Sequence, residues 1–144
     1  MNGKGTIWIV IGPILLVGSA IVVAQSSTAL PTKFAGHYQS HAGRGGKTNI
    51  IPVELADVTV DGDNVRGILS NYRSPASNCL ADNTPFSGTY RDGTLSVKTQ
   101  RLKSQVADGR PCGGVTIEVT LTGARGSGTI RAGSDAYSID LEAK

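Results

Sequence analysis

The sequence predicts an all-β domain, a single small antiparallel meander that we expect to close as an eight-stranded up-and-down barrel. The composition is one reason: 19 glycines stand against 2 Phe, 1 Met and 1 Trp in 144 residues, which favours short strands and turns. A repeated hairpin pattern is the other. Residues 58–69 (VTVDGDNVRGIL) and 119–130 (VTLTGARGSGTI) share V-T, an apolar residue, a turn and a glycine. A β-sandwich is the alternative, but closing the sheet removes its exposed edges and favours the barrel.

The chain opens with an apolar segment. Residues 6–24 carry no charge, and a helix of this length would span about 28 Å, close to the thickness of a bilayer core. Two interpretations stay open: an uncleaved membrane anchor through residues 6–24, or a signal peptide cleaved after Ala24. Lys4 before the segment predicts that the N-terminus stays in the cytoplasm and that the domain lies outside it. We therefore expect a cell-envelope protein with one membrane span, or a secreted or periplasmic protein if the segment is removed.

The remaining chain divides into a polar linker, residues 25–32, and a barrel-like domain, residues 33–144. In residues 115–122 apolar side chains at odd positions alternate with Thr and Glu, the pattern of an antiparallel sheet with one buried face. In the second strand the apolar positions change phase, which predicts a β-bulge near Ala56 and Asp57, and Pro52 indicates an edge or a strand start. The eight predicted strands are residues 33–39, 50–60, 65–72, 85–90, 94–101, 115–122, 126–132 and 136–142.

The lengths of the loops distinguish the two ends of such a meander. The links at 61–64, 91–93 and 123–125 are tight turns, whereas those at 40–49, 73–84 and 102–114 are long. Because connections alternate between the two ends, the tight turns are expected at one end and the long loops at the other. Cys79 and Cys112 then lie in neighbouring long loops, and an even, small number of cysteines in an exported protein predicts a disulfide between them.

The long-loop end is also the basic end. Its six cations outnumber the carboxylates of Asp82 and Asp108 by four. A basic barrel mouth favours an anionic small molecule, a glycan or an acidic protein surface as partner. The predicted ligand-binding residues are Arg44, Lys47, Arg73, Arg101, Lys103, Arg110 and His41.

Several other functions are not expected. The net charge of +3 is too small to predict nucleic-acid binding, and two Cys with two His lack the spacing of a zinc site. Residues 41–48 (HAGRGGKT) have His41 where a P-loop needs Gly, and a strand rather than a helix follows them. No G-x-S-x-G motif is present. We predict no catalytic residue, no metal and no cofactor.

One hairpin, within residues 86–95 (FSGTYRDGTL), resembles a hairpin of the avidin-like barrels over about ten residues of ordinary β sequence. Avidin-type sites surround biotin with tryptophans, and the single tryptophan here is Trp8 in the apolar segment. The resemblance therefore implies no biotin site.

The sequence leads to one functional hypothesis and two alternatives. The first is a non-enzymatic binding or interaction module of the envelope that acts through its basic long loops. The second is a structural subunit of a membrane-associated envelope assembly, docked through the anchor and a sheet edge. The third is a small hydrolase that uses His37 or His41 with a nearby serine. The sequence predicts neither the identity of the ligand nor the oligomeric state.

Overall fold

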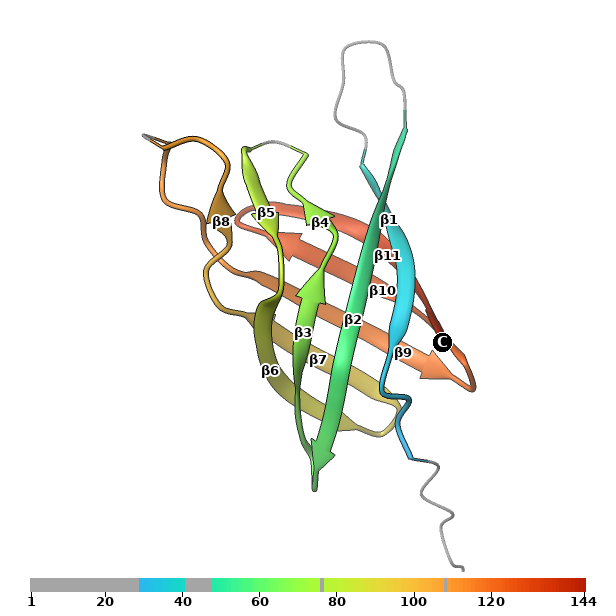
Figure 1. Ribbon diagram of the computed structural model, residues 1–144. Coiled ribbons are helices and arrows are strands. Elements are labelled where there is room, and N and C mark those ends of the chain that lie inside the picture. Colours follow the sequence, from blue (N-terminus) through green and yellow to red (C-terminus); the bar gives the residue numbers. More distant parts are fainter. Residues whose placement is uncertain (1–28, 41–47, 76, 108) are drawn as a thin grey trace, which may run out of the picture.

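The computed structural model describes residues 29–40, 48–75, 77–107 and 109–144 as an all-β structure (Figure 1). Eight strands form one closed antiparallel barrel in the order β1-β11-β10-β9-β7-β6-β3-β2. A separate three-stranded sheet, which we call the small sheet, has the order β4-β5-β8 and lies beyond the ends of β3, β6 and β7 (Figure 1). The barrel strands are β1 (Phe34–Ser40), β2 (Asn49–Asp61), β3 (Asn64–Ser70), β6 (Thr84–Arg91), β7 (Thr94–Thr99), β9 (Val115–Thr122), β10 (Arg125–Ala132) and β11 (Asp135–Ala143). Those of the small sheet are β4 (Tyr72–Arg73), β5 (Cys79–Ala81) and β8 (Lys103–Ser104).

The predicted barrel is confirmed, and the sandwich is wrong. Each barrel strand pairs with its neighbour along the chain, and β1 closes the ring by pairing with β11 from Phe34↔Ala143 to Tyr38↔Ile139. Closure pairs most strand edges within the barrel, although residues 50–53 of β2 pair with β1 and not with β3. The predicted N-terminal helix and membrane span lie outside the described residues. Among the residues that are described, none belongs to a helix that could cross a bilayer.

Two predicted strands end earlier than expected. The third ends at Ser70 because Asn71 adopts a left-handed backbone with φ of 62°, and Tyr72 belongs to β4 instead. The fifth ends at Thr99 rather than Arg101. These two ends release the chain from the barrel wall and allow it to build the small sheet.

The predicted bulge in β2 is confirmed. The register between β2 and β3 shifts between Ala56 and Thr59, and Asp57 takes a positive φ of 51°. The inward positions therefore change from Val53 and Leu55 before the bulge to Val58 after it, and all three side chains are buried. Pro52 lies in the first part of β2, which pairs with β1 before the pairing with β3 begins.

Inward side chains fill the barrel, as the alternating pattern predicts. Most of the buried hydrophobic side chains are aliphatic, and the fully buried ones include Leu55, Leu69, Leu95, Ile117 and Ile130. Phe34 and Phe86 add the only two phenylalanine rings of the chain to this core. The interior is thus occupied by side chains, and the grooves that the structure offers lie on its outside.

Glycines allow the strands to approach closely where the sheet bends. At Gly36, Gly88 and Gly128 a side chain would collide with a main-chain carbonyl of the neighbouring strand. Gly128, for example, lies against the carbonyl of Glu118 on β9. Such glycines permit the sharp curvature that closing an eight-stranded sheet requires.

Candidate functional site

The long-loop end holds the predicted cysteines and those predicted basic residues that the structure describes, namely Arg73, Arg101, Lys103 and Arg110. The sulfur atoms of Cys79 and Cys112 lie 1.95 Å apart, which is a disulfide distance, and their Cα atoms are 5.8 Å apart. The pair joins β5 to the segment that leads into β9. This end therefore has two long connections fixed to one another at the barrel mouth.

The link between β10 and β11 also lies at this end, although it is short. Ala132 pairs directly with Asp135, so only Gly133 and Ser134 form the turn. The tight links that the sequence assigned to the opposite end were 61–64, 91–93 and 123–125, and this further tight turn was not among them. The turn places the carboxylate of Asp135 at the long-loop end, so this end is less basic than the sequence predicts.

The small sheet presents two cations on one face. Arg73 pairs with Leu80, and Leu80 pairs with Lys103, so the three residues form one row across β4, β5 and β8. Side chains at directly paired positions share a face of a sheet. Arg73 and Lys103 are exposed and flank the half-buried Leu80. Lys103 also lies 3.4 Å from the carboxylate of Asp82.

The opposite face of the small sheet packs on the barrel. Its residues Tyr72 and Ala81 are paired and buried, with 1% and 3% of their surfaces exposed. The ring of Tyr72 stacks on Tyr38 of β1 at a centroid distance of 5.3 Å, and Tyr38 contacts Tyr137 of β11 at 5.6 Å. The Tyr38 hydroxyl donates a hydrogen bond to the main-chain carbonyl of Arg73. Aromatic packing and one hydrogen bond therefore hold the small sheet over the barrel mouth.

Burial changes the acidity of these tyrosines. Desolvation raises the pKa of Tyr72 to about 12, with a further contribution from Tyr137, while the nearby Ser74 hydroxyl opposes the shift. Desolvation, with smaller contributions from Tyr72 and Tyr137, also raises the pKa of Tyr38. The Tyr72 hydroxyl oxygen is buried and has no hydrogen-bond partner of good geometry in the described part of the chain. Both phenols are thus neutral over the physiological pH range.

A groove of about 640 Å³ opens beside this cluster, and we call it the loop-end groove. Its walls come from the Cys79–Cys112 pair, the segment around Arg110 and the β10–β11 turn with Asp135. Ser74 and Asp135, which both influence the pKa of Tyr72, line it as well. The groove therefore offers one guanidinium, one carboxylate and several hydroxyl groups to a ligand.

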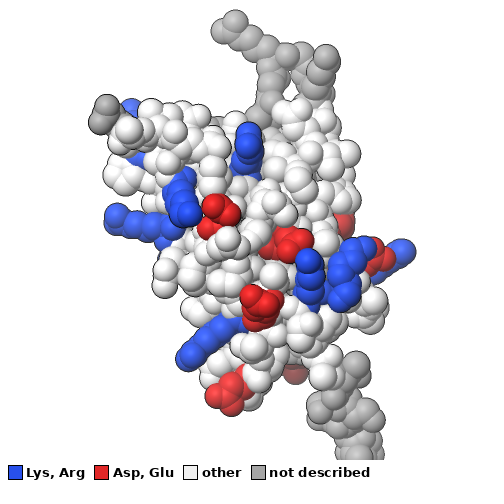
Figure 2. Space-filling model, in the orientation of Figure 1, with Lys and Arg blue, Asp and Glu red and all other residues white. Residues whose placement is uncertain are grey.

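The predicted basic residues lie at different places around this end. Among them only Arg110 lines the loop-end groove, while Arg73 and Lys103 lie on the outer face of the small sheet. Arg101 is exposed on the link between β7 and β8. In Figure 2 several basic side chains lie over the region of β4, β5 and β8, with an acidic side chain among them, and others lie elsewhere on the same face. His41, Arg44 and Lys47 lie outside the described residues.

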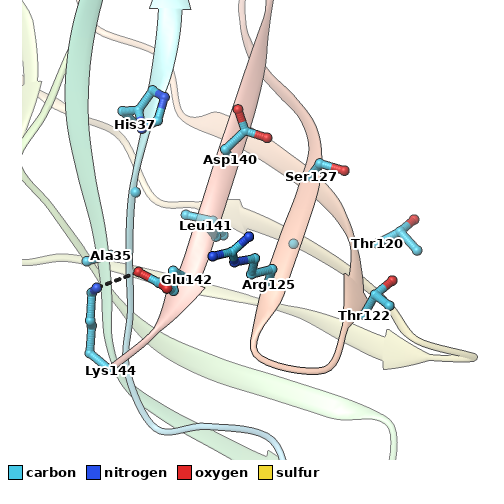
Figure 3. Close-up of a pocket in the computed structure, with 12 residues that line it drawn as sticks. Ala35, His37, Thr120, Thr122, Arg125, Ser127, Asp140, Leu141, Glu142 and Lys144 are labelled. Carbon is cyan, nitrogen blue, oxygen red and sulfur yellow. Dashed lines mark hydrogen bonds and ion pairs between the residues drawn. The ribbon is translucent and has the colours of Figure 1, made fainter.

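A second groove, of about 700 Å³, lies on the outer wall of β1, β9, β10 and β11, and we call it the wall groove (Figure 3). One row of directly paired residues crosses it: His37, Asp140, Ser127 and Thr120. Imidazole, carboxylate and hydroxyl therefore follow one another across three strands. The carboxylate stands between the other two groups, whereas a Ser-His-Asp triad needs the imidazole in the middle.

A parallel row in the wall groove carries mixed charge. It contains Ala35, Glu142, Arg125 and Thr122 in paired positions. The ammonium of Lys144 lies 2.7 Å from the Glu142 carboxylate and lowers the pKa of that group (Figure 3). The sequence analysis missed this groove because alternation predicts only which residues face outward. Which outward residues meet depends on the register between strands.

No known protein family, curated protein or solved structure matches the chain.

Proposed function

We propose that this chain is a non-enzymatic binding module of a cell envelope, which holds an anionic ligand or partner at its long-loop end. One observation carries the proposal. Arg73 and Lys103 stand in one row on the outer face of the small sheet, next to Arg101 and to a groove lined by Arg110. These four cations, on the small sheet and its flanking loops, provide donors for carboxylate or phosphate oxygens over one end of the barrel.

The construction of this end supports a binding role. A site binds more tightly when its residues are positioned before the ligand arrives. Here the Cys79–Cys112 pair, the stacked rings of Tyr72 and Tyr38, and the hydrogen bond from Tyr38 to Arg73 all hold the loops in place. The charged side chains are thus mounted on a fixed support.

Location outside the cytoplasm is part of the same proposal. The apolar residues 6–24 would anchor or export the chain, and two cysteines at disulfide distance suit an oxidising compartment. An anionic small molecule, a glycan and an acidic protein surface are the partner classes that such a domain would meet there.

The row of His37, Asp140 and Ser127 supports the non-enzymatic form of the proposal. A serine nucleophile needs a base within hydrogen-bonding reach, about 2.6–3.2 Å. Two strand spacings of about 4.8 Å each separate the backbones of His37 and Ser127, and the Asp140 position lies between them.

Neutralising the loop-end cations tests the proposal. The variant Arg101→Gln/Lys103→Gln/Arg110→Gln should lose most of its retention on immobilised oligogalacturonate and on a glycan array. The matched control, Lys33→Gln/Arg125→Gln/Lys144→Gln, removes the same charge from the wall groove and the neighbouring strand ends. Equal retention of the two variants and the parent would refute an anionic ligand at the long-loop end.

The start of β2 favours a structural subunit as the second candidate. Residues 50–53 pair with β1 but not with β3, and the Ile50 side chain is 67% exposed. A strand from another subunit could extend the sheet there. Chemical cross-linking of the native membrane would capture a partner at a cysteine placed at Ile50. A purely monomeric product would argue against this role.

A further inference from the structure

A third groove lies on the barrel wall below the small sheet, between two cations. It has a volume of about 380 Å³ and crosses β3, β6 and β7. Arg66 pairs with Ser87, and Ser87 pairs with Lys98, so a hydroxyl stands between the two cations in one row. The Cα atoms of Arg66 and Lys98 are therefore about 10 Å apart, two strand spacings, and their long side chains can converge above Ser87.

Among the residues that the structure describes, no carboxylate lines this groove, which we call the cationic groove. Arg66 and Lys98 are both exposed, and neither belongs to an ion pair among the described residues. Asp57 lies in the bulge of β2, two residues before Thr59, the residue that pairs with Arg66. Asp57 is exposed, and it forms no ion pair with Arg66 among the described residues. The two cations are available to an external anion.

The other lining groups suit a sugar better than a bare phosphate. Besides the cations, the groove presents the Ser87 hydroxyl, the exposed amide of Gln100 and the exposed ring of Pro85. Hydroxyl and amide groups bond sugar hydroxyls, and an apolar ring can cover the apolar face of a sugar. Carboxylates on the same sugars would meet Arg66 and Lys98.

The cationic groove lies close to the long-loop end along the chain. Lys98 is three residues from Arg101, so at most about 11 Å of extended chain separates their Cα atoms. The main-chain amide of Gln100 bonds to the carbonyl of Pro85, which keeps this segment beside β6. Figure 1 shows the small sheet above β3, β6 and β7 on this side of the barrel, and Figure 2 shows basic side chains above and below on the same side.

We infer that Arg66, Ser87 and Lys98 form a second anion subsite, and that the ligand is a linear, carboxylate-bearing glycan that runs from the long-loop end down this wall. The inference rests on the proposed function, because it extends the same surface. It adds a ligand class and a length requirement. A short acidic sugar occupies one end of the surface, whereas a longer chain engages both subsites at once, and linked contacts strengthen binding far beyond either alone.

The experiment compares short and long oligogalacturonates on the full chain by isothermal titration. The parent should bind the long oligomer at least about tenfold more tightly than the dimer, as expected for two linked subsites. Arg66→Gln/Lys98→Gln should lose this gain and keep its affinity for the dimer. Arg125→Gln/Lys144→Gln, on the opposite wall, should behave as the parent, and circular dichroism with urea unfolding verifies that all variants fold.

Three results would separate the possible failures. If Arg66→Gln/Lys98→Gln still binds the long oligomer more tightly than the dimer by the same factor as the parent, the inference is wrong and the loop-end proposal is unaffected. Unchanged dimer affinity in Arg101→Gln/Lys103→Gln/Arg110→Gln overturns the proposed function itself. Linear polyphosphate that binds the parent as tightly as the uronate of equal charge overturns the glycan assignment.

Discussion

The phenol of Tyr38 on β1 donates its hydrogen bond to the main-chain carbonyl of Arg73 on β4. This contact links the barrel to the small sheet across 35 residues of sequence. It also fixes the strand that carries one of the proposed ligand-binding cations. Stability and the proposed function therefore depend on the same few residues at the barrel mouth.

The two stacked tyrosines should respond differently to loss of the hydroxyl. Tyr38→Phe removes the donor to Arg73 and leaves that carbonyl without it, so the free energy of unfolding should fall by about 1–2 kcal/mol. Tyr72→Phe removes a buried hydroxyl that lacks a partner of good geometry, so it should be neutral or slightly stabilising. Urea unfolding of both variants checks the contrast. A larger loss in Tyr72→Phe than in Tyr38→Phe would contradict it.

Alkaline pH should destabilise the fold through the same pair. Burial raises the pKa of Tyr72 from 10.0 to about 12, so the unfolded chain releases this proton first as pH rises. The neutral phenol of Tyr72 therefore makes its full contribution to the free energy of unfolding below pH 10. Between pH 10 and 12 this contribution declines, by up to about 1.4 kcal/mol per pH unit for each buried tyrosine whose pKa is raised. Urea unfolding of the parent and of Tyr38→Phe/Tyr72→Phe between pH 10 and 12 measures how much of the decline comes from these two tyrosines. A parallel decline in both proteins would show that other groups cause it.

Loss of the cysteine bond should loosen the long-loop end. A link between residues 33 positions apart stabilises a fold by about 3–4 kcal/mol when it restricts the unfolded chain. Cys79→Ser/Cys112→Ser should lose stability of this order. Hydrogen exchange should increase most in the small sheet and around Arg110, because those segments depend on the link. Uniform exchange across barrel and small sheet would speak against this local role.

The close strand approach at Gly128 should tolerate no side chain. Gly128→Ala places a methyl group against the Glu118 carbonyl, and overpacking of this kind costs about 1–3 kcal/mol or more. Gly113→Ala is the matched control, because nothing lies near the position of its new methyl group and its φ is not positive. The control should be neutral or slightly stabilising. Thermal unfolding of the two variants gives the comparison, and equal midpoints would contradict the strained-contact argument.

Strand positions could be predicted well because alternation is a local property. Side chains on a strand point to opposite faces in turn, so the pattern in residues 115–122 locates β9 without knowledge of its neighbours. The change of phase around Ala56 and Asp57 located the bulge for the same reason. The break at Asn71 was missed because a left-handed asparagine leaves no periodic signal.

The candidate sites could be predicted only in part. Loop lengths placed Cys79 and Cys112 at one end, and the structure brings their sulfur atoms to bonding distance. The same argument missed Asp135, because it compared only the links at 61–64, 91–93 and 123–125 with the long ones and left out the turn between β10 and β11. His37, Asp140 and Ser127 come from three distant parts of the chain, and no local pattern relates them.

Local patterns in the sequence predicted the barrel strands, the bulge in β2 and three tight turns, because each depends on residues adjacent in the chain. The cysteine pair and the closed barrel followed from the expected topology. The packing of the whole chain was needed to show which outward side chains share a row, and that the chain after β3 and β7 leaves the barrel to form the small sheet. The reason is register. Pairing between strands fixes the neighbours of Arg66, Arg73 and His37, and pairing is set by packing of the whole barrel rather than by any segment of it.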